Sequence, residues 1–225
     1  MKLAALIPCR KGSKGIPDKN FKELCGKPLW KWTLDEAIKS GIFDKIILSS
    51  DGGFKESFNG KVILDNDRPS ELATDIATTD QVLTYYSLKY PEVKIWCILQ
   101  ATSPLRIAED IKKAYNIIKL PKYDSLVSVT QNPGMLWIDN SVGYKDSIYP
   151  VATYHIHKRP MRQDRKDWYM ENGAIYFTKK YVIDQMGARL GGKIALYPMP
   201  QERSLEIDSE FDWKIAEFVS GKAVS

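Results

Sequence analysis

Short apolar runs alternate with longer amphipathic stretches along the first 130 residues of the chain. Residues 3–7 are all apolar and are followed by Pro8, a pattern typical of a buried strand that ends at the proline. Similar runs predict further strands at 45–50, 61–64, 95–99 and 125–129. The stretches between them predict helices from Pro28 to the stop at Gly41, over 78–90 and over 107–120. This alternation predicts an α/β fold around a mostly parallel sheet, with the run at 95–99 as its central strand.

The predicted helices carry boundary signals of known type. Thr78 and Gln81 have the spacing of a capping box, and Pro121 follows the end of the third helix. In the first helix, with Pro28 in the first helical position, the apolar spacing predicts a buried face made of Leu29, Trp32, Ala37 and Ile38.

After Thr130 the alternation stops for about forty residues and then resumes. The segment 132–170 contains the helix breakers Pro133, Gly134, Pro150 and Pro160 and several extended, aromatic-rich pieces, without helical periodicity. Beyond it, strands are predicted at 174–177 and 193–197, a helix from about residue 179, and a final helix at 210–219. We therefore expect residues 1–225 to form one domain that carries an inserted arm at 132–170.

Composition and charge narrow the class of protein. A chain of 225 residues with 44% hydrophobic and 27% charged residues has the size and composition of one globular domain. No apolar run approaches the ~20 residues that span a bilayer. The three cysteines form no C-x-x-C pair, which favours reduced thiols and a cytoplasmic location. This composition favours neither a membrane nor a nucleic acid as a partner.

The positive charge is concentrated in one segment. Between Arg10 and Lys31 there are seven basic residues against two acidic ones, an excess of five that equals the net charge of the whole chain. One basic segment suits a small anionic ligand better than a nucleic acid. The segment directly follows the first predicted strand, and in open α/β sheets ligands bind at the carboxyl ends of the strands.

The sequence of this basic loop, C-R-K-G-S-K-G-I-P-D-K-N at 9–20, can present backbone N–H groups and cations together to a polyphosphate. It is neither a dinucleotide-binding fingerprint, which needs three glycines, nor a Walker A loop, which needs Gly-Lys before Ser or Thr. Arg10, Lys14 and Lys19 are the candidate phosphate ligands, and Gly12 and Gly15 allow the backbone to approach the phosphates.

Several collinear motifs resemble those of the CMP-sialic acid synthetases, the acylneuraminate cytidylyltransferases. They are R-K-G-S-K-G-I-P-D-K-N, L-S-S-D at 48–51, R-P-S-E-L-A-T-D at 68–75, L-Q-A-T-S-P-L-R at 99–106, E-N-G-A-I-Y at 171–176 and I-D-S-E-F-D at 207–212. The resemblance spans nearly the whole chain. It implies a Rossmann-like nucleotidyltransferase fold with a mostly parallel central sheet, in which 132–170 is a small dimerisation arm and the protein is a homodimer.

The resemblance also implies an activity. A nucleotidyltransferase of this family joins CMP from CTP to a nine-carbon, sialic-type nonulosonic acid and releases pyrophosphate. It implies that Arg10 and Lys19 contact the triphosphate, that Asn20 helps to bind the nucleotide, and that Arg68 and Thr79 hold the cytidine end. From the sequence alone, Arg68 could instead form a surface ion pair with Glu71.

Carboxylates near the C-terminus are the candidate metal ligands. Glu206 and Asp208 alternate with apolar residues, which predicts that both lie on one face of an extended segment at the edge of the sheet. Oxygen ligands of this kind suit Mg²⁺. The family pattern is D-x-D, so Glu206 departs from it and Asp208 is the stronger candidate. Glu210 and Asp212 are assigned to the N-terminus of the last helix.

For the sugar acid, the resemblance selects Gln100 and Arg162, the latter supplied by the neighbouring subunit. The cations of some relatives before Asn172 and near Met135 are absent, which leaves the native acid open among N-acetylneuraminic, legionaminic, pseudaminic and other derivatives. Two alternatives remain: another sugar nucleotidyltransferase, of the CMP-Kdo or sugar-1-phosphate type, and a non-catalytic CTP-binding module. His155 and His157, placed on a strand by their spacing, lack a third metal ligand nearby and are assigned a structural role.

Overall fold

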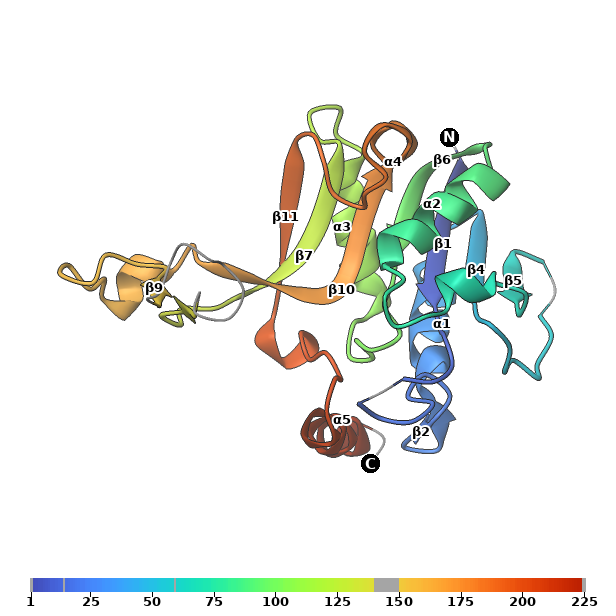
Figure 1. The fold of residues 1–225 in the computed structure, drawn as a ribbon, viewed down its shortest axis with the longest axis horizontal. Helices are drawn as coiled ribbons and strands as arrows, with labels where there is room; N and C mark the ends of the chain where they lie inside the picture. Colours follow the sequence, from blue (N-terminus) through green and yellow to red (C-terminus); the bar gives the residue numbers. More distant parts are fainter. Residues whose placement is uncertain (1, 14, 59, 140–149, 224–225) are drawn as a thin grey trace.

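A seven-stranded mixed sheet forms the centre of the chain in a computed structural model that describes residues 2–13, 15–58, 60–139 and 150–223. Its order is β11-β7-β10-β6-β1-β4-β5, so β6 is central, as predicted (Figure 1). The strands are β1 (Lys2–Pro8), β4 (Lys45–Ser49), β5 (Val62–Asp65), β6 (Val93–Ile98), β7 (Ser125–Gln131), β10 (Tyr169–Lys179) and β11 (Ile194–Met199). Among these strands, β10 alone runs antiparallel to its neighbours, which confirms a mostly parallel sheet.

Helices cover both faces of the sheet. They are α1 (Leu29–Ser40), α2 (Thr79–Lys89), α3 (Ala108–Ile118), α4 (Lys180–Met186) and α5 (Glu210–Ala223). Side chains of α1 and α3 pack with Leu3, Ala5 and Ile7 of β1, whereas those of α2 and α4 pack with Ala4 and Leu6. Because successive side chains of a strand point to opposite faces, the continuous apolar run in β1 serves two cores at once. α5 lies apart from these layers, beyond the carboxyl end of β1 (Figure 1).

The predicted face of α1 was only partly right. The helix buries Leu29, Trp30, Thr33, Leu34, Ala37 and Ser40, whereas Ile38 is 39% exposed and Trp32 is half-buried. The reason is that α1 packs against α3 as well as against the sheet, so its buried stripe is wider and rotated. Pro28 lies just before the helix instead of in its first position, while Gly41 ends it in the left-handed conformation, with φ 69°. The capping box of Thr78 and Gln81 opens α2 as predicted.

A small third cluster lies below the carboxyl ends of the strands. It unites Ile16 of the basic loop with Leu24 of the hairpin β2 (Glu23–Leu24)–β3 (Lys27–Pro28), Leu29 of α1, Ile207, and Trp213 and Ala216 of α5. The segment 204–208, which we call the strap, is thereby packed against the basic loop. This cluster determines how the two segments approach each other.

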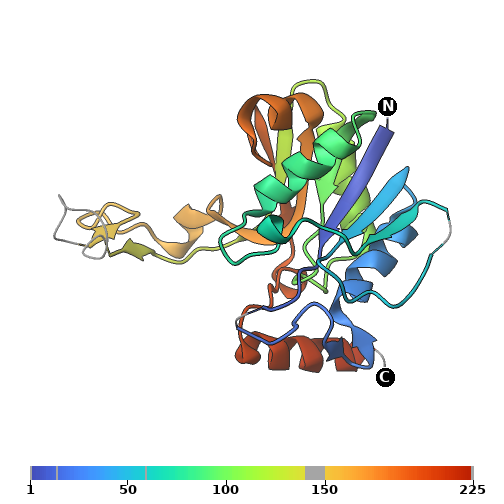
Figure 2. The ribbon, with the colours of Figure 1, turned by 45° about the vertical axis from the view of Figure 1, so that its right-hand side comes forward.

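The arm at 132–170 projects away from the sheet (Figures 1 and 2). Its described residues form a short hairpin of β8 (Trp137–Ile138) and β9 (Val151–Ala152) and a 3-10 turn at Arg162–Arg165. Its apolar side chains are about half exposed at Leu136, Trp137, Ile138 and Val151. Two further apolar residues of the arm, Ile148 and Tyr149, lie outside the described residues. His155 and His157 lie in a turn, so their placement on a strand was wrong; their ring centroids are 6.0 Å apart.

None of the helices in the described part of the chain combines the length and hydropathy needed to cross a membrane.

Candidate functional site

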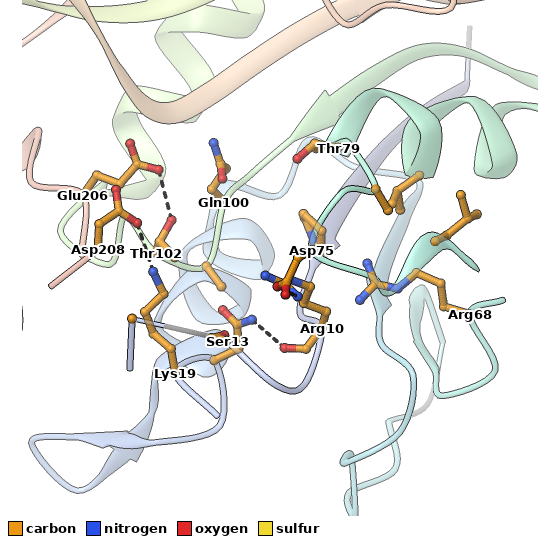
Figure 3. A pocket seen from close by; sticks show the side chains of 17 residues that line it. Arg10, Ser13, Lys19, Arg68, Asp75, Thr79, Gln100, Thr102, Glu206 and Asp208 are labelled. Atoms are coloured by element: carbon orange, nitrogen blue, oxygen red, sulfur yellow. Dashed lines mark hydrogen bonds and ion pairs between the residues drawn. The ribbon is translucent and has the colours of Figure 1, made fainter. Parts of the chain in front are cut away.

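A cavity of about 520 Å³ opens at the carboxyl ends of β1 and β6 (Figure 3). Its walls come from four segments that are distant in sequence: the basic loop after β1, residues 68–82, the turn after β6, and the strap. The predicted residues among its lining are Arg10, Gly15, Lys19, Asn20, Arg68, Thr79, Gln100, Glu206 and Asp208. The fold therefore gathers nine of the twelve sequence candidates around one cavity.

The other three candidates lie elsewhere. Gly12 is in the basic loop but does not line the cavity; its N–H donates to Asp18 Oδ1 at 3.2 Å in a turn with φ 66°. Lys14 lies outside the described residues. Arg162 belongs to the arm, where it lines a separate cavity with Lys166 and Gln201. Within one chain, Arg162 is not part of the cavity at the strand ends.

The basic loop is held open by polar contacts around Arg10. The Asn20 Nδ2 donates to the Arg10 carbonyl oxygen at 2.9 Å, which fixes the course of the loop. The Arg10 guanidinium points into the cavity and lies 2.8 Å from Asp75 Oδ1 (Figure 3). Arg10 and Asp75 are both about one-third exposed, so this ion pair is accessible to a ligand that competes for the guanidinium.

The strap is fixed to the basic loop and to the turn after β6. The Ile207 N–H donates to the Thr102 carbonyl oxygen at 2.8 Å. Lys19 Nζ donates to the Ile207 carbonyl oxygen at 2.5 Å and lies 3.0 Å from Asp208 Oδ1. A Cβ added to Gly15 would lie 2.7 Å from the Asp208 carbonyl oxygen, so a glycine is needed for this close approach. The strap is not a strand of the sheet: it is held by Thr102, in the turn after the central strand β6, and by Lys19 of the basic loop. Its predicted position at the sheet edge was therefore wrong, because these long-range contacts leave no signal in the local sequence pattern.

Glu206 and Asp208 both face the cavity (Figure 3). Glu206 is half-buried and accepts a hydrogen bond from Thr102 Oγ1 at 3.3 Å, whereas the Asp208 side chain is 72% exposed. Burial, together with the neighbouring Asp208 carboxylate, raises the pKa of Glu206. The Glu206 and Asp208 carboxylates repel each other, and a bound cation would relieve this repulsion.

Arg68 lies at the opposite side of the cavity and is only 5% exposed. Its Nε and Nη2 have no hydrogen-bond partner among the described residues, and the nearest carboxylate oxygen recorded is Asp51 Oδ1 at 3.9 Å. Burial lowers the pKa of this guanidinium, against the effect of Asp51. An ion pair with Glu71, the structural alternative, is not among the contacts in the described chain. A buried guanidinium with free N–H groups favours a polar ligand at this end of the cavity.

Comparison with known proteins agrees with this geometry. The family model described as cytidylyltransferase matches residues 4–218. The chain belongs to this family.

Curated relatives bear the names that the sequence motifs suggested. N-acylneuraminate cytidylyltransferase A of Danio rerio is 35% identical over 219 residues, covering 96% of this chain and 50% of the relative. The N-acylneuraminate cytidylyltransferases of Streptococcus agalactiae serotype III and Escherichia coli O18:K1:H7 are 34% and 31% identical, over 95% and 96% of this chain and 52% and 51% of those relatives. The chain thus spans about half the length of these curated relatives. The resemblance to the CMP-sialic acid synthetases is confirmed.

Solved cytidylyltransferase structures share the fold. CMP:2-keto-3-deoxy-manno-octonic acid synthetase complexed with CTP superposes with a TM-score of 0.71 at 16% identity, covering 99% of this chain and all of the other. 2-C-methyl-D-erythritol 4-phosphate cytidylyltransferase from Thermus thermophilus gives 0.64 at 14% identity, covering 98% and 100%. The Rossmann-like nucleotidyltransferase fold is confirmed.

Three further polar residues of the chain line the cavity although sequence reasoning did not select them: Ser13, Asp75 and Thr102. Each lies inside a motif that carried the family resemblance, so the motifs did contain a signal. Their side chains are common on any protein surface, and only the fold shows which of them face the cavity.

Proposed function

We propose that the chain is the catalytic unit of a cytidylyltransferase that activates a sialic-type nonulosonic acid with CTP, giving the CMP-sugar and pyrophosphate. The observation that carries the proposal is the joint presence, in one cavity, of the basic loop and the carboxylates of the strap, linked by Lys19 (Figure 3). The names of the relatives supply the substrate class.

Each residue of the cavity has a separate role in the proposed reaction. Arg10 and Lys19 neutralise the triphosphate and stabilise the charge that develops as pyrophosphate leaves. Arg68 and Thr79 hold the cytidine end, with Asn20 supporting the loop beneath it. Gln100 orients the acid so that its anomeric hydroxyl attacks the α-phosphorus in line. Positioning and charge stabilisation account for most of the rate in phosphoryl and nucleotidyl transfer.

The same cavity suits Mg²⁺. The described part of the chain offers no group of three or more His, Cys, Asp or Glu ligands that could hold a metal alone. Mg²⁺ typically takes one or two carboxylates and completes its shell with waters and substrate phosphates, so Asp208 and Glu206 fit as its protein ligands. When bound, Mg²⁺ would neutralise phosphate charge and bring the triphosphate to the strap.

The activity is tested by pyrophosphate release from CTP and Mg²⁺ with a panel of nonulosonic acids. We expect turnover with at least one nine-carbon acid, and none when the acid is omitted. Turnover with a sugar 1-phosphate or with Kdo alone would overturn the choice of acceptor. CTP binding in calorimetry without pyrophosphate release, whichever acceptor is supplied, would instead favour the non-catalytic CTP-binding module.

We also propose a homodimer in which the arm reaches the partner's cavity and supplies Arg162, because the exposed apolar side chains of the arm need a partner surface. An arginine fork pairs well with the carboxylate of a sugar acid. Mixing an Arg162→Ala chain with an Asp208→Asn chain then restores activity, since one of the two cavities in a mixed dimer is intact. About a quarter of the wild-type rate is expected from random assortment. A monomer in sedimentation, or mixtures as inactive as each variant, would contradict this arrangement.

A further inference from the structure

Arg106 is a buried cation behind the cavity wall that the proposed chemistry does not use. Its side chain is 1% exposed and it does not line the cavity. It has no carboxylate within ion-pair distance among the residues that the structure describes. Burial lowers the pKa of its guanidinium to about 10, so it remains charged near neutral pH. Burying a guanidinium without a carboxylate partner costs free energy, so the groups to which Arg106 donates hydrogen bonds indicate its role.

Those hydrogen bonds converge on the turn that carries Gln100. Arg106 Nη2 donates to the Gln100 carbonyl oxygen at 3.0 Å and also to Thr33 Oγ1 of α1. The Thr33 hydroxyl in turn donates to the same Gln100 oxygen at 3.4 Å, and the Ser103 N–H does so at 3.3 Å. The Gln100 peptide is therefore fixed by donors from α1 and from the turn itself. Because its side chain lines the cavity, this peptide sets where the amide group is presented.

A third hydrogen bond of Arg106 extends the connection to β10. Arg106 Nη1 donates to the Ala174 carbonyl oxygen at 2.6 Å. The preceding residue, Gly173, has φ 66° and lies directly against Glu206, since an added Cβ would come within 2.6 Å of Glu206 Oε2. Arg106 thus connects the Gln100 turn with the stretch of β10 against which the strap carboxylate rests.

We propose that Arg106 is a positioning residue for the acceptor half of the reaction, acting through the Gln100 peptide and the Gly173 backbone. This inference rests on the proposed function. A planar guanidinium suits the task because it donates in fixed directions to acceptors on three elements, α1, the turn after β6 and β10. A lysine ammonium could reach one or two of them, and an apolar side chain none. The CTP ligands Arg10 and Arg68 come from other segments and do not contact this network.

The proposal is tested with Arg106→Met, Arg106→Lys and Thr33→Val. Thr33→Val is nearly isosteric, so it still tests the proposal if the Arg106→Met protein does not fold. We expect Thr33→Val to lower kcat/KM for the acid about 10-fold and Arg106→Met about 100-fold, because small displacements of positioning groups have effects of that order. Arg106→Lys should retain more activity than Arg106→Met. The dissociation constant for CTP, measured by calorimetry, should stay within about twofold.

Two controls separate positioning from a general loss of structure. Ile118→Ala creates a cavity at the far end of α3 and should lower the melting temperature without changing kcat/KM for the acid. Combining Thr33→Val with Gln100→Ala should be no worse than Gln100→Ala alone, since both act through one group. Additive losses, or equal weakening of CTP and acid, would overturn the positioning role. A wild-type chain inactive with every acid would instead defeat the proposed function itself.

Discussion

Replacing Arg10 by alanine is expected to lower kcat/KM for CTP by about 10³-fold while shifting the melting temperature by only ~2–4 °C. The large loss follows because the guanidinium points into the cavity, where it would contact the negatively charged triphosphate. The small shift follows because the side chain is about one-third exposed and its described ion pair, with Asp75 at 2.8 Å, is of the screened surface kind. Pyrophosphate release and thermal unfolding measure the two effects.

Lys11→Ala is the matched control for this change. Lys11 is the adjacent cation in the same loop, but it does not line the cavity and is held through its backbone N–H, which donates to Asp51 Oδ1 at 2.9 Å. Its removal should leave kcat/KM for CTP within about twofold, because an exposed charge outside the site acts only through screened, long-range attraction. If Arg10→Ala lowered the melting temperature by more than about 10 °C, or if both variants lost equal activity, Arg10 would be a structural or general electrostatic residue.

The elements that could be predicted are those whose evidence is local. Four strands are short apolar runs between amphipathic stretches, namely β1, β4, β6 and β7. The start of α2 is marked in the sequence by the capping box of Thr78 and Gln81. The extent of β10 could not be predicted in the same way. Its first residues, from Tyr169 to Glu171, are exposed and lie before a register irregularity between Glu171 and Tyr176, so their strand conformation comes from pairing with β7. The antiparallel direction of β10 also has no local signature.

The site shows the same division between local and distant causes. Arg10, Lys19 and Asp208 lie in contiguous motifs, so their selection needed only the sequence. Arg106 also lies in a motif, but a lone arginine there could equally be a surface residue. That it is buried, and bound to Gln100 and Ala174, depends on the packing of α1, β6 and β10 together.

The strap packs closely against the basic loop, so we expect substitution of its carboxylates to have the second large effect on turnover. Asp208→Asn is expected to reduce turnover by about 10³-fold with little change in stability. The side chain is 72% exposed, so folding does not depend on its charge. The amide keeps the shape but is a weaker ligand for a hard cation such as Mg²⁺. A Mg²⁺ titration of pyrophosphate release should show a raised half-saturating concentration as well as a lower maximal rate.

Glu210→Gln is the control for Asp208→Asn because it removes a nearby carboxylate that does not line the cavity. Glu210 opens α5 and lies 3.5 Å from Lys22 Nζ, so its loss should affect stability slightly and the Mg²⁺ dependence not at all. Glu206→Gln decides the remaining question about the strap. A raised Mg²⁺ requirement in that variant would make Glu206 a second ligand, whereas an unchanged requirement would leave Asp208 alone. Should Asp208→Asn keep both its rate and its Mg²⁺ dependence, the strap would have no part in binding the cation.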